Sequence, residues 1–252
     1  MDKEQIIAKR KTKLIFLENN QVVKEFDPLF PKSSVLNEAL NHSMVEESGL
    51  SVPRLIDIKL EGAKRSITME YIHGHDLETI MKKDAKNIQR HIDFMVDVEL
   101  EMHSKKVEGL KKIKDKYGDK LCKAPYDATT RYELFNLLEK LPTHTKLCHG
   151  DFNPSNIMID DKGNYYIIDW SHATQGNASA DAALTYLQFV LAKKQKIADL
   201  YLDAFCKKSD TAVQYVKKWL PIVAAVTAIN VEDEEQRKIL DGFVKDVFKI
   251  NQ

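Results

Sequence analysis

Residues 149–170 read HGDFNPSNIMIDDKGNYYIIDW, and this stretch is the most informative part of the chain. Two short runs of β-branched and aromatic residues, 157–159 and 165–168, enclose the segment Asp-Asp-Lys-Gly-Asn. Apolar runs separated by a glycine-containing turn are typical of a β-hairpin. The sequence therefore predicts a hairpin whose two-residue turn is formed by Lys162 and Gly163.

The open end of this hairpin carries oxygen-bearing side chains. A two-residue turn places Asn156 opposite Asp169, with Cβ atoms about 4.5–5.5 Å apart. An amide oxygen and a carboxylate at that separation can bind Mg²⁺, which prefers oxygen ligands. Asp151 lies upstream in a loop that Pro154 keeps from becoming helical. Because phosphoryl transfer needs an oriented hydroxyl and metal charge on the phosphates, the pattern predicts a phosphotransferase.

The segments HGDFNPSN and IIDW resemble the catalytic and metal-binding segments of the aminoglycoside phosphotransferase and choline kinase family, distant relatives of protein kinases. The resemblance implies that Asp151 is the catalytic base and that Asn156 and Asp169 hold magnesium. It also implies supporting roles for two residues. His149 would brace the catalytic loop, and Asp181 would support this loop from a following helix.

The same resemblance implies an α+β, bilobal, protein-kinase-like fold. Residues 1–72 would form the nucleotide-binding lobe, with a small antiparallel sheet and one helix. Residues 73–252 would form a mainly helical catalytic and substrate-binding lobe that carries the hairpin. The resemblance in sequence covers roughly residues 13–190, and beyond them only the expected architecture is similar. There, residues 219–229 predict a buried helix.

The amino-terminal lobe has its own strand and helix signals. Segments 13–17 and 22–26 flank Glu-Asn-Asn-Gln and predict a second hairpin. A helix capped by Ser33 or Ser34 should follow and end at Gly49. Its expected apolar positions recur at helical spacing: Leu36, Ala39, Leu40 and Met44.

A lysine and a glutamate in this lobe are candidate nucleotide-binding residues. By resemblance to kinases, Lys24 on the second strand would bind the α- and β-phosphates, and Glu38 on the helix would hold Lys24. Glu46 is the other candidate acid on this helix. The alternative for Lys24 and Glu38 is two solvent-exposed side chains, which are common in a chain that is 30% charged.

Two further segments bear on the nucleotide. Residues 65–74 resemble the hinge of these kinases, where the backbone groups of Glu70 and Ile72 would contact adenine. The loop over the phosphates is usually rich in glycine, since glycine lets backbone N–H groups approach oxygen. Here that loop is Lys-Arg-Lys-Thr at residues 9–12. The preference for ATP or GTP therefore stays open.

Composition narrows the function classes. Thirty-eight basic residues balance 38 acidic ones, which does not favour a nucleic-acid or membrane protein. The lysines of residues 105–123 read as a solvated helix and loop. The first residues lack the apolar core of a signal peptide. Three unpatterned cysteines suit a reducing cytosol, and we expect a cytoplasmic protein.

The acceptor is the least determined feature. We expect ATP or GTP as phosphate donor, Mg²⁺ as cofactor, and a small molecule with a hydroxyl group as substrate. The acidic run of residues 232–235 either attracts a cationic amine or caps a helix. Two alternatives remain. One is a Ser/Thr protein kinase, disfavoured because no peptide-docking segment is evident between Asp169 and Asp181. The other is a nucleotide-binding protein without turnover.

Overall fold

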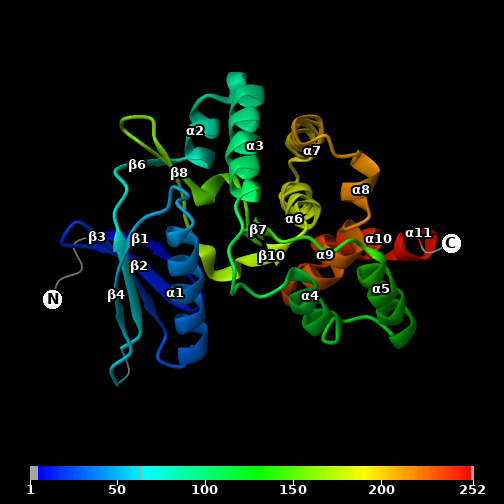
Figure 1. Cartoon of the computed structure of the whole chain (residues 1–252), viewed down its shortest axis with the longest axis horizontal. Coiled ribbons are helices and arrows are strands. Elements are labelled where there is room, and N and C mark those ends of the chain that lie inside the picture. Colours follow the sequence, from blue (N-terminus) through cyan, green and yellow to red (C-terminus); the bar gives the residue numbers. More distant parts are fainter. Residues whose placement is uncertain (1–4, 63, 251–252) are drawn as a thin grey trace. The chain divides into compact units, whose positions relative to one another are not determined.

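A computed structural model describes residues 5–62 and 64–250, and its contacts separate the chain into two compact units (Figure 1). The first unit extends to Lys83 and includes residues 154–173; the second comprises residues 84–153 and the part of the chain from Thr174 onward. The combination of antiparallel sheet and helices confirms the α+β fold. The expected lobes, 1–72 and 73–252, remain a functional interpretation. The compact units differ from them because the hairpin belongs to the first unit.

The first unit is built on an antiparallel sheet with the strand order β1-β2-β3-β5-β4. Its strands are β1 (Gln5–Lys9), β2 (Lys13–Glu18), β3 (Gln21–Phe26), β4 (Leu55–Lys59) and β5 (Ser66–Glu70). β2 and β3 form the predicted amino-terminal hairpin. Asn19 and Asn20 in its turn have φ values of 51° and 58°, as the favoured two-residue hairpin turn requires.

Helix α1 (Lys32–Glu47) packs against β4 and β5, beside the sheet in Figure 1. It begins after Pro31 without a side-chain cap, so the predicted cap at Ser33 or Ser34 is wrong. The predicted apolar face is partly wrong too, because Leu36 and Leu40 are 48% and 53% exposed. The helix instead buries both apolar and polar side chains: Val35, Glu38, Ala39, Asn41, His42 and Val45.

The buried polar side chains of α1 have partners in the first unit. Asn41 Nδ2 donates to the carbonyl oxygen of Trp170 at 3.4 Å. His42 Nε2 lies 2.6 Å from the carbonyl oxygen of Pro53. Burial lowers the pKa of His42, which favours the neutral ring. Because hydrogen bonds are directional, these polar contacts fix the orientation of α1 more closely than apolar packing alone would.

A second sheet of the first unit has the order β6-β8-β9. Its strands are β6 (Gly74–Asp76), β8 (Ile157–Asp160) and β9 (Tyr165–Ile167), and β8 and β9 form the predicted hairpin. The turn is one residue longer than predicted. The N–H of Asp160 donates to the carbonyl of Asn164 at 2.9 Å, and Gly163 has a φ of 87°, which suits the last position of a three-residue turn.

The longer turn shifts the register by one residue. Asn156 lies opposite Ile168, whose N–H donates to the Asn156 carbonyl oxygen at 2.9 Å. The predicted opposition of Asn156 and Asp169 is therefore wrong, because a one-residue slip exchanges the faces of a strand. Asp169 instead follows the end of β9 with a left-handed backbone, with φ 65° and ψ 61°.

The remaining helices of the first unit are short. Asp76 caps α2 (Leu77–Lys83), with Oδ1 accepting the Thr79 N–H at 2.8 Å. The 3-10 turn η2 (Pro154–Asn156) packs against α2, and η3 (Trp170–His172) packs against α1.

The second unit is mainly helical. Its helices are α3 (Ile88–Ser104), α4 (Ile113–Leu121), α5 (Ala128–Lys140), α6 (Ala178–Leu191), α7 (Gln195–Ser209), α8 (Val213–Lys217), α9 (Leu220–Thr227), α10 (Glu234–Lys245) and α11 (Val247–Ile250), with the 3-10 turns η1 (Ala85–Asn87) and η4 (Ala228–Asn230). Strands β7 (Lys146–Cys148) and β10 (Thr174–Gly176) pair antiparallel among them. α9 is almost wholly buried, which confirms the helix predicted within residues 219–229. Within the described residues, every helix is too short or too polar to cross a bilayer.

Candidate active site

Lys24 and Glu38 form a buried ion pair in the first unit. Lys24 lies on the central strand β3, and its Nζ is 2.8 Å from Glu38 Oε1 on α1. Both side chains are less than a tenth exposed, so they are not the solvent-exposed pair of the alternative. Burial would by itself lower the pKa of Lys24, but Asp169 and Glu38 outweigh it, and the net shift is upward. Lys24 is therefore held as an ammonium ion.

Asp169 completes this cluster. Its Oδ1 accepts a hydrogen bond from Lys24 at 3.3 Å, and its Oδ2 accepts one from Lys13 at 3.4 Å. The left-handed backbone of Asp169 is one that aspartate tolerates better than most residues. Trp170 follows; it is fully buried, and its Nε1 donates to the Ile167 carbonyl at 3.0 Å. The carboxylate is thus fixed between two ammonium groups.

The other expected residues of this unit are placed as follows. Asn156 ends η2 and is 8% exposed. Glu70 ends β5; its N–H donates to the Arg54 carbonyl at 2.9 Å, and its Oε2 accepts from the Arg54 N–H at 3.2 Å. Ile72 follows β5 and is buried. Glu46, the other candidate acid, has a different partner, because its Oε2 accepts the Leu55 N–H at 3.1 Å.

Asp181 braces the loop that begins at His149, within the second unit. Its carboxylate oxygens accept the backbone N–H groups of His149 at 2.6 Å and Gly150 at 2.7 Å. His103 Nε2 lies 3.5 Å from Oδ2 of Asp181. Burial would raise the pKa of Asp181, but the hydrogen bond and charge of His103 outweigh it, and the net shift is downward. Asp181 at the start of α6 thereby fixes the backbone of the HGD segment.

Asp151 follows in the same loop. Its Oδ1 accepts hydrogen bonds from Gln188 Nε2 at 2.5 Å and from Asn153 Nδ2 at 3.4 Å. Gln188 and Asp181 lie two turns apart on one side of α6, so this helix orients both the loop backbone and the Asp151 carboxylate. Asp151 is partly exposed.

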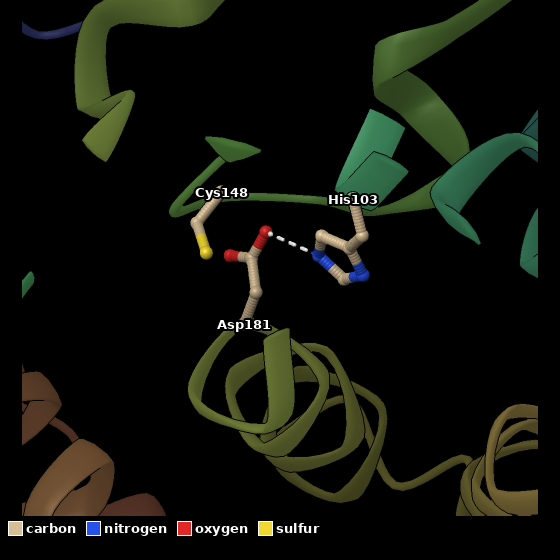
Figure 2. A group of neighbouring side chains, drawn as sticks. All are labelled: His103, Cys148 and Asp181. Carbon is tan, nitrogen blue, oxygen red and sulfur yellow. Dashed lines mark hydrogen bonds and ion pairs between the residues drawn. The ribbon is translucent and has the colours of Figure 1, made fainter. Parts of the chain in front are cut away.

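Cys148, His103 and Asp181 form a cluster of potential metal ligands, with ligand atoms within 4.8 Å of one another (Figure 2). The donors on Asp181 argue against a metal there, because backbone N–H groups occupy its oxygens. Burial raises the pKa of Cys148, which favours the thiol over the thiolate that a metal binds. Its Sγ contacts the Lys146 carbonyl oxygen at 3.6 Å. The cluster is a structural brace of the loop.

A buried carboxyl lies on α3, one turn before His103. Glu99 is fully buried and accepts the Tyr201 hydroxyl at 2.9 and 2.7 Å on its two oxygens. Burial raises the pKa of Glu99 well above its ordinary value, and the charge of Asp181 adds to this. Burial therefore favours the neutral form of Glu99 in the folded protein, whereas the side chain ionises at its ordinary pKa in the unfolded chain.

We expect Glu99→Gln to stabilise the protein above the ordinary glutamate pKa. The raised pKa makes wild-type stability fall as pH rises above 4.5, because only the unfolded state then releases the proton. Gln avoids this cost and still accepts the Tyr201 hydroxyl bond. Each kcal/mol gained in the free energy of unfolding should raise Tm by about 2–4 °C. Thermal unfolding from pH 4.5 to mildly alkaline buffer measures the gain, which should vanish at the acidic end. The exposed Glu101→Gln is the control, and a pH-independent difference would contradict the assignment.

The structure adds two residues that sequence reasoning missed. Lys13 contacts Asp169, and Gln188 contacts Asp151. Lys13 is the first residue of β2 and directly follows the Lys-Arg-Lys-Thr segment of residues 9–12. Its position beside the expected phosphate loop could have marked it as a candidate. Gln188 could have been found from its two-turn spacing from Asp181 on one helix.

The chain belongs to the phosphotransferase enzyme family, whose model matches residues 19–215, more than half of the chain. It is accordingly a phosphotransferase with a kinase-like fold. None of the curated protein sequences matches the chain. Solved structures resemble this chain in fold, at sequence identities of 10–17%.

Three solved structures illustrate this fold. Choline kinase LicA from Streptococcus pneumoniae is 17% identical, with a TM-score of 0.67 over 98% of this chain and 92% of that chain. A thermostable mutant of aminoglycoside phosphotransferase APH(4)-Ia is 12% identical, with a TM-score of 0.68 over 98% and 94%. A choline/ethanolamine kinase family protein from Mesorhizobium loti is 15% identical, with a TM-score of 0.63 over 97% and 86%.

Proposed function

We propose that this phosphotransferase moves the γ-phosphoryl group of ATP, or of GTP, to a hydroxyl group of a small molecule. The observation that carries the proposal is the ion pair of the first unit, in which Lys24 is 2.8 Å from Glu38 and 3.3 Å from Asp169. A buried strand lysine held by a helix glutamate, beside a carboxylate, is the arrangement by which kinases position nucleotide phosphates.

The residues present fit a divalent cation. Asp169 offers a carboxylate and Asn156 an amide oxygen, which are ligand types that Mg²⁺ takes. The bound cation would neutralise charge on the phosphates during transfer. Lys24 would bind the phosphates, and the backbone groups of Glu70 and Ile72 would contact the base of the nucleotide.

Asp151 would orient and deprotonate the acceptor hydroxyl. Gln188 and Asn153 hold its carboxylate by hydrogen bonds to Oδ1. His149 and Asp181 would keep the loop backbone in place. Because a general base must be fixed within hydrogen-bond reach of the proton that it removes, this bracing is part of the proposed chemistry.

The neighbours support a nucleotide donor and a small acceptor. LicA has been solved in complex with AMP, and APH(4)-Ia with AMP-PNP and hygromycin B. The acidic run of residues 232–235 gives no support to a cationic acceptor. Asp233 caps α10 by accepting the Gln236 N–H at 2.8 Å, and Glu235 pairs with Lys193 at 2.6 Å. The proposed acceptor class, an amino alcohol, an aminoglycoside, a sugar or a similar small molecule, therefore rests on the family match and not on this acidic run.

Nucleoside diphosphate release across an acceptor panel tests this function. Mg-ATP and Mg-GTP are each supplied with amino alcohols, aminoglycosides, sugars and hydroxy amino acids, and reactions without acceptor give the background. We expect turnover that depends on one acceptor class and stops when EDTA removes the cation. Nucleotide binding in a thermal-shift assay without turnover on any acceptor would instead favour the binding-only alternative.

A further inference from the structure

Lys13 is a second lysine in the Asp169 cluster. Its Nζ is 3.4 Å from Asp169 Oδ2 and 3.9 Å from Glu38 Oε1, while Lys24 approaches the other oxygen of Asp169. The Lys13 side chain is 18% exposed, against 8% for Lys24. Two ammonium groups and two carboxylates thus balance in charge, and Lys13 is the more accessible cation.

The loop before Lys13 does not provide the usual backbone cradle for phosphate. It connects β1 to β2 through residues 10–12, and the Arg10 N–H donates to the Lys13 carbonyl at 2.8 Å. Residues 9–13 are all described by the structure, and none has a positive φ. Successive N–H groups that cradle an anion commonly alternate right-handed and left-handed residues. The positive charge of this loop is instead on side chains, those of Lys9, Arg10 and Lys11.

We propose that Lys13 is a second phosphate-binding lysine that replaces the missing glycine loop; this inference rests on the proposed function. Before nucleotide binds, Lys13 neutralises Asp169. In the nucleotide complex, Asp169 would hold the divalent cation, and the ammonium of Lys13 would bind the polyphosphate. A nucleoside triphosphate stays negative after it binds one divalent cation, so it can accept both lysines as partners. The flexible four-carbon stem of lysine allows this exchange of partners.

Equilibrium binding without acceptor tests the proposal. The dissociation constants of AMP and of the triphosphate that the wild type binds are measured by calorimetry with Mg²⁺ for Lys13→Met and Lys13→Arg. We expect Lys13→Met to weaken triphosphate binding by about tenfold, since a hydrogen bond to a charged group is lost, and to leave AMP binding unchanged. Lys13→Arg should restore most of the affinity because it keeps the charge.

The control removes one lysine from the edge strand β4 of the same sheet. Lys59 on β4 forms an exposed ion pair with Asp57 at 3.5 Å. The Lys59→Met variant should bind both nucleotides as the wild type does. Unchanged triphosphate affinity in Lys13→Met, or an equal loss for AMP, would overturn the role of Lys13 alone. A wild type that binds no nucleotide would overturn the proposed function and this inference together.

Discussion

Asp151→Asn should lower kcat by about 10²–10⁴-fold, the range that general acid–base catalysis contributes. Asparagine keeps the size of the side chain and an oxygen that can accept the hydrogen bond from Gln188. It cannot take a proton from a hydroxyl. Because the residues proposed to bind the phosphates are unchanged, the affinity for nucleotide should stay at the wild-type value. Steady-state rates and calorimetric nucleotide binding measure the two quantities separately.

A matched control removes a carboxylate elsewhere in the second unit. Asp119 on α4 is exposed and paired with Lys111, so Asp119→Asn should change neither rate nor affinity. Turnover of Asp151→Asn within a few-fold of the wild type would exclude Asp151 as the base. A loss of nucleotide affinity equal to the loss of kcat would point to a collapsed loop.

Asp181→Asn should give the second large effect, and mainly on stability. The carboxylate accepts N–H groups from His149 and Gly150 and lies beside His103. Asparagine has one acceptor oxygen, and its NH₂ group would face a buried donor. Breaking a buried charged contact of this kind costs about 3–5 kcal/mol, which corresponds to a Tm lower by about 6–20 °C.

The pH dependence gives this prediction a second measurement. The pKa of Asp181 is lowered in the folded state, so its stabilising contribution is present above 3.8 and is lost as pH falls through the folded pKa. The Tm difference between wild type and Asp181→Asn should therefore narrow in acid. The exposed Asp203→Asn on α7 is the control. Equal Tm values at neutral pH would contradict the bracing role.

Local signals predicted much of the fold. The Asn-Asn turn predicted the first hairpin because both residues tolerate positive φ. The second hairpin was also predicted, but its register was not. Either Lys162-Gly163 or a turn one residue longer satisfies the pattern, and only the hydrogen bonds of Asp160 decide between them. Register depends on such details, which composition does not reveal.

Helix α1 shows why hydrophobic periodicity did not predict which side chains are buried near the candidate site. An apolar stripe through Leu36 and Leu40 would have placed these residues inside, but they are exposed. Glu38, Asn41 and His42 occupy the inner face because partners on other segments satisfy them. Hydrophobic patterns do not report such long-range polar contacts. The same reason explains why Lys13 and Gln188 were missed, while Lys24, Glu38 and Asp181 were anticipated through resemblance.

The discontinuity of the first unit has a consequence for the order of folding during synthesis. Strand β6 pairs with β8, from Gly74 to Asp160, and α1 packs on η3 at Trp170. A nascent chain that ends at Lys83 has neither partner, so β6 has an open edge and α1 an uncovered face. All of residues 84–153 must be synthesised before these partners follow. Closure of so long a loop is slow, and we expect the amino-terminal segment to need protection from aggregation until Ala173 has emerged.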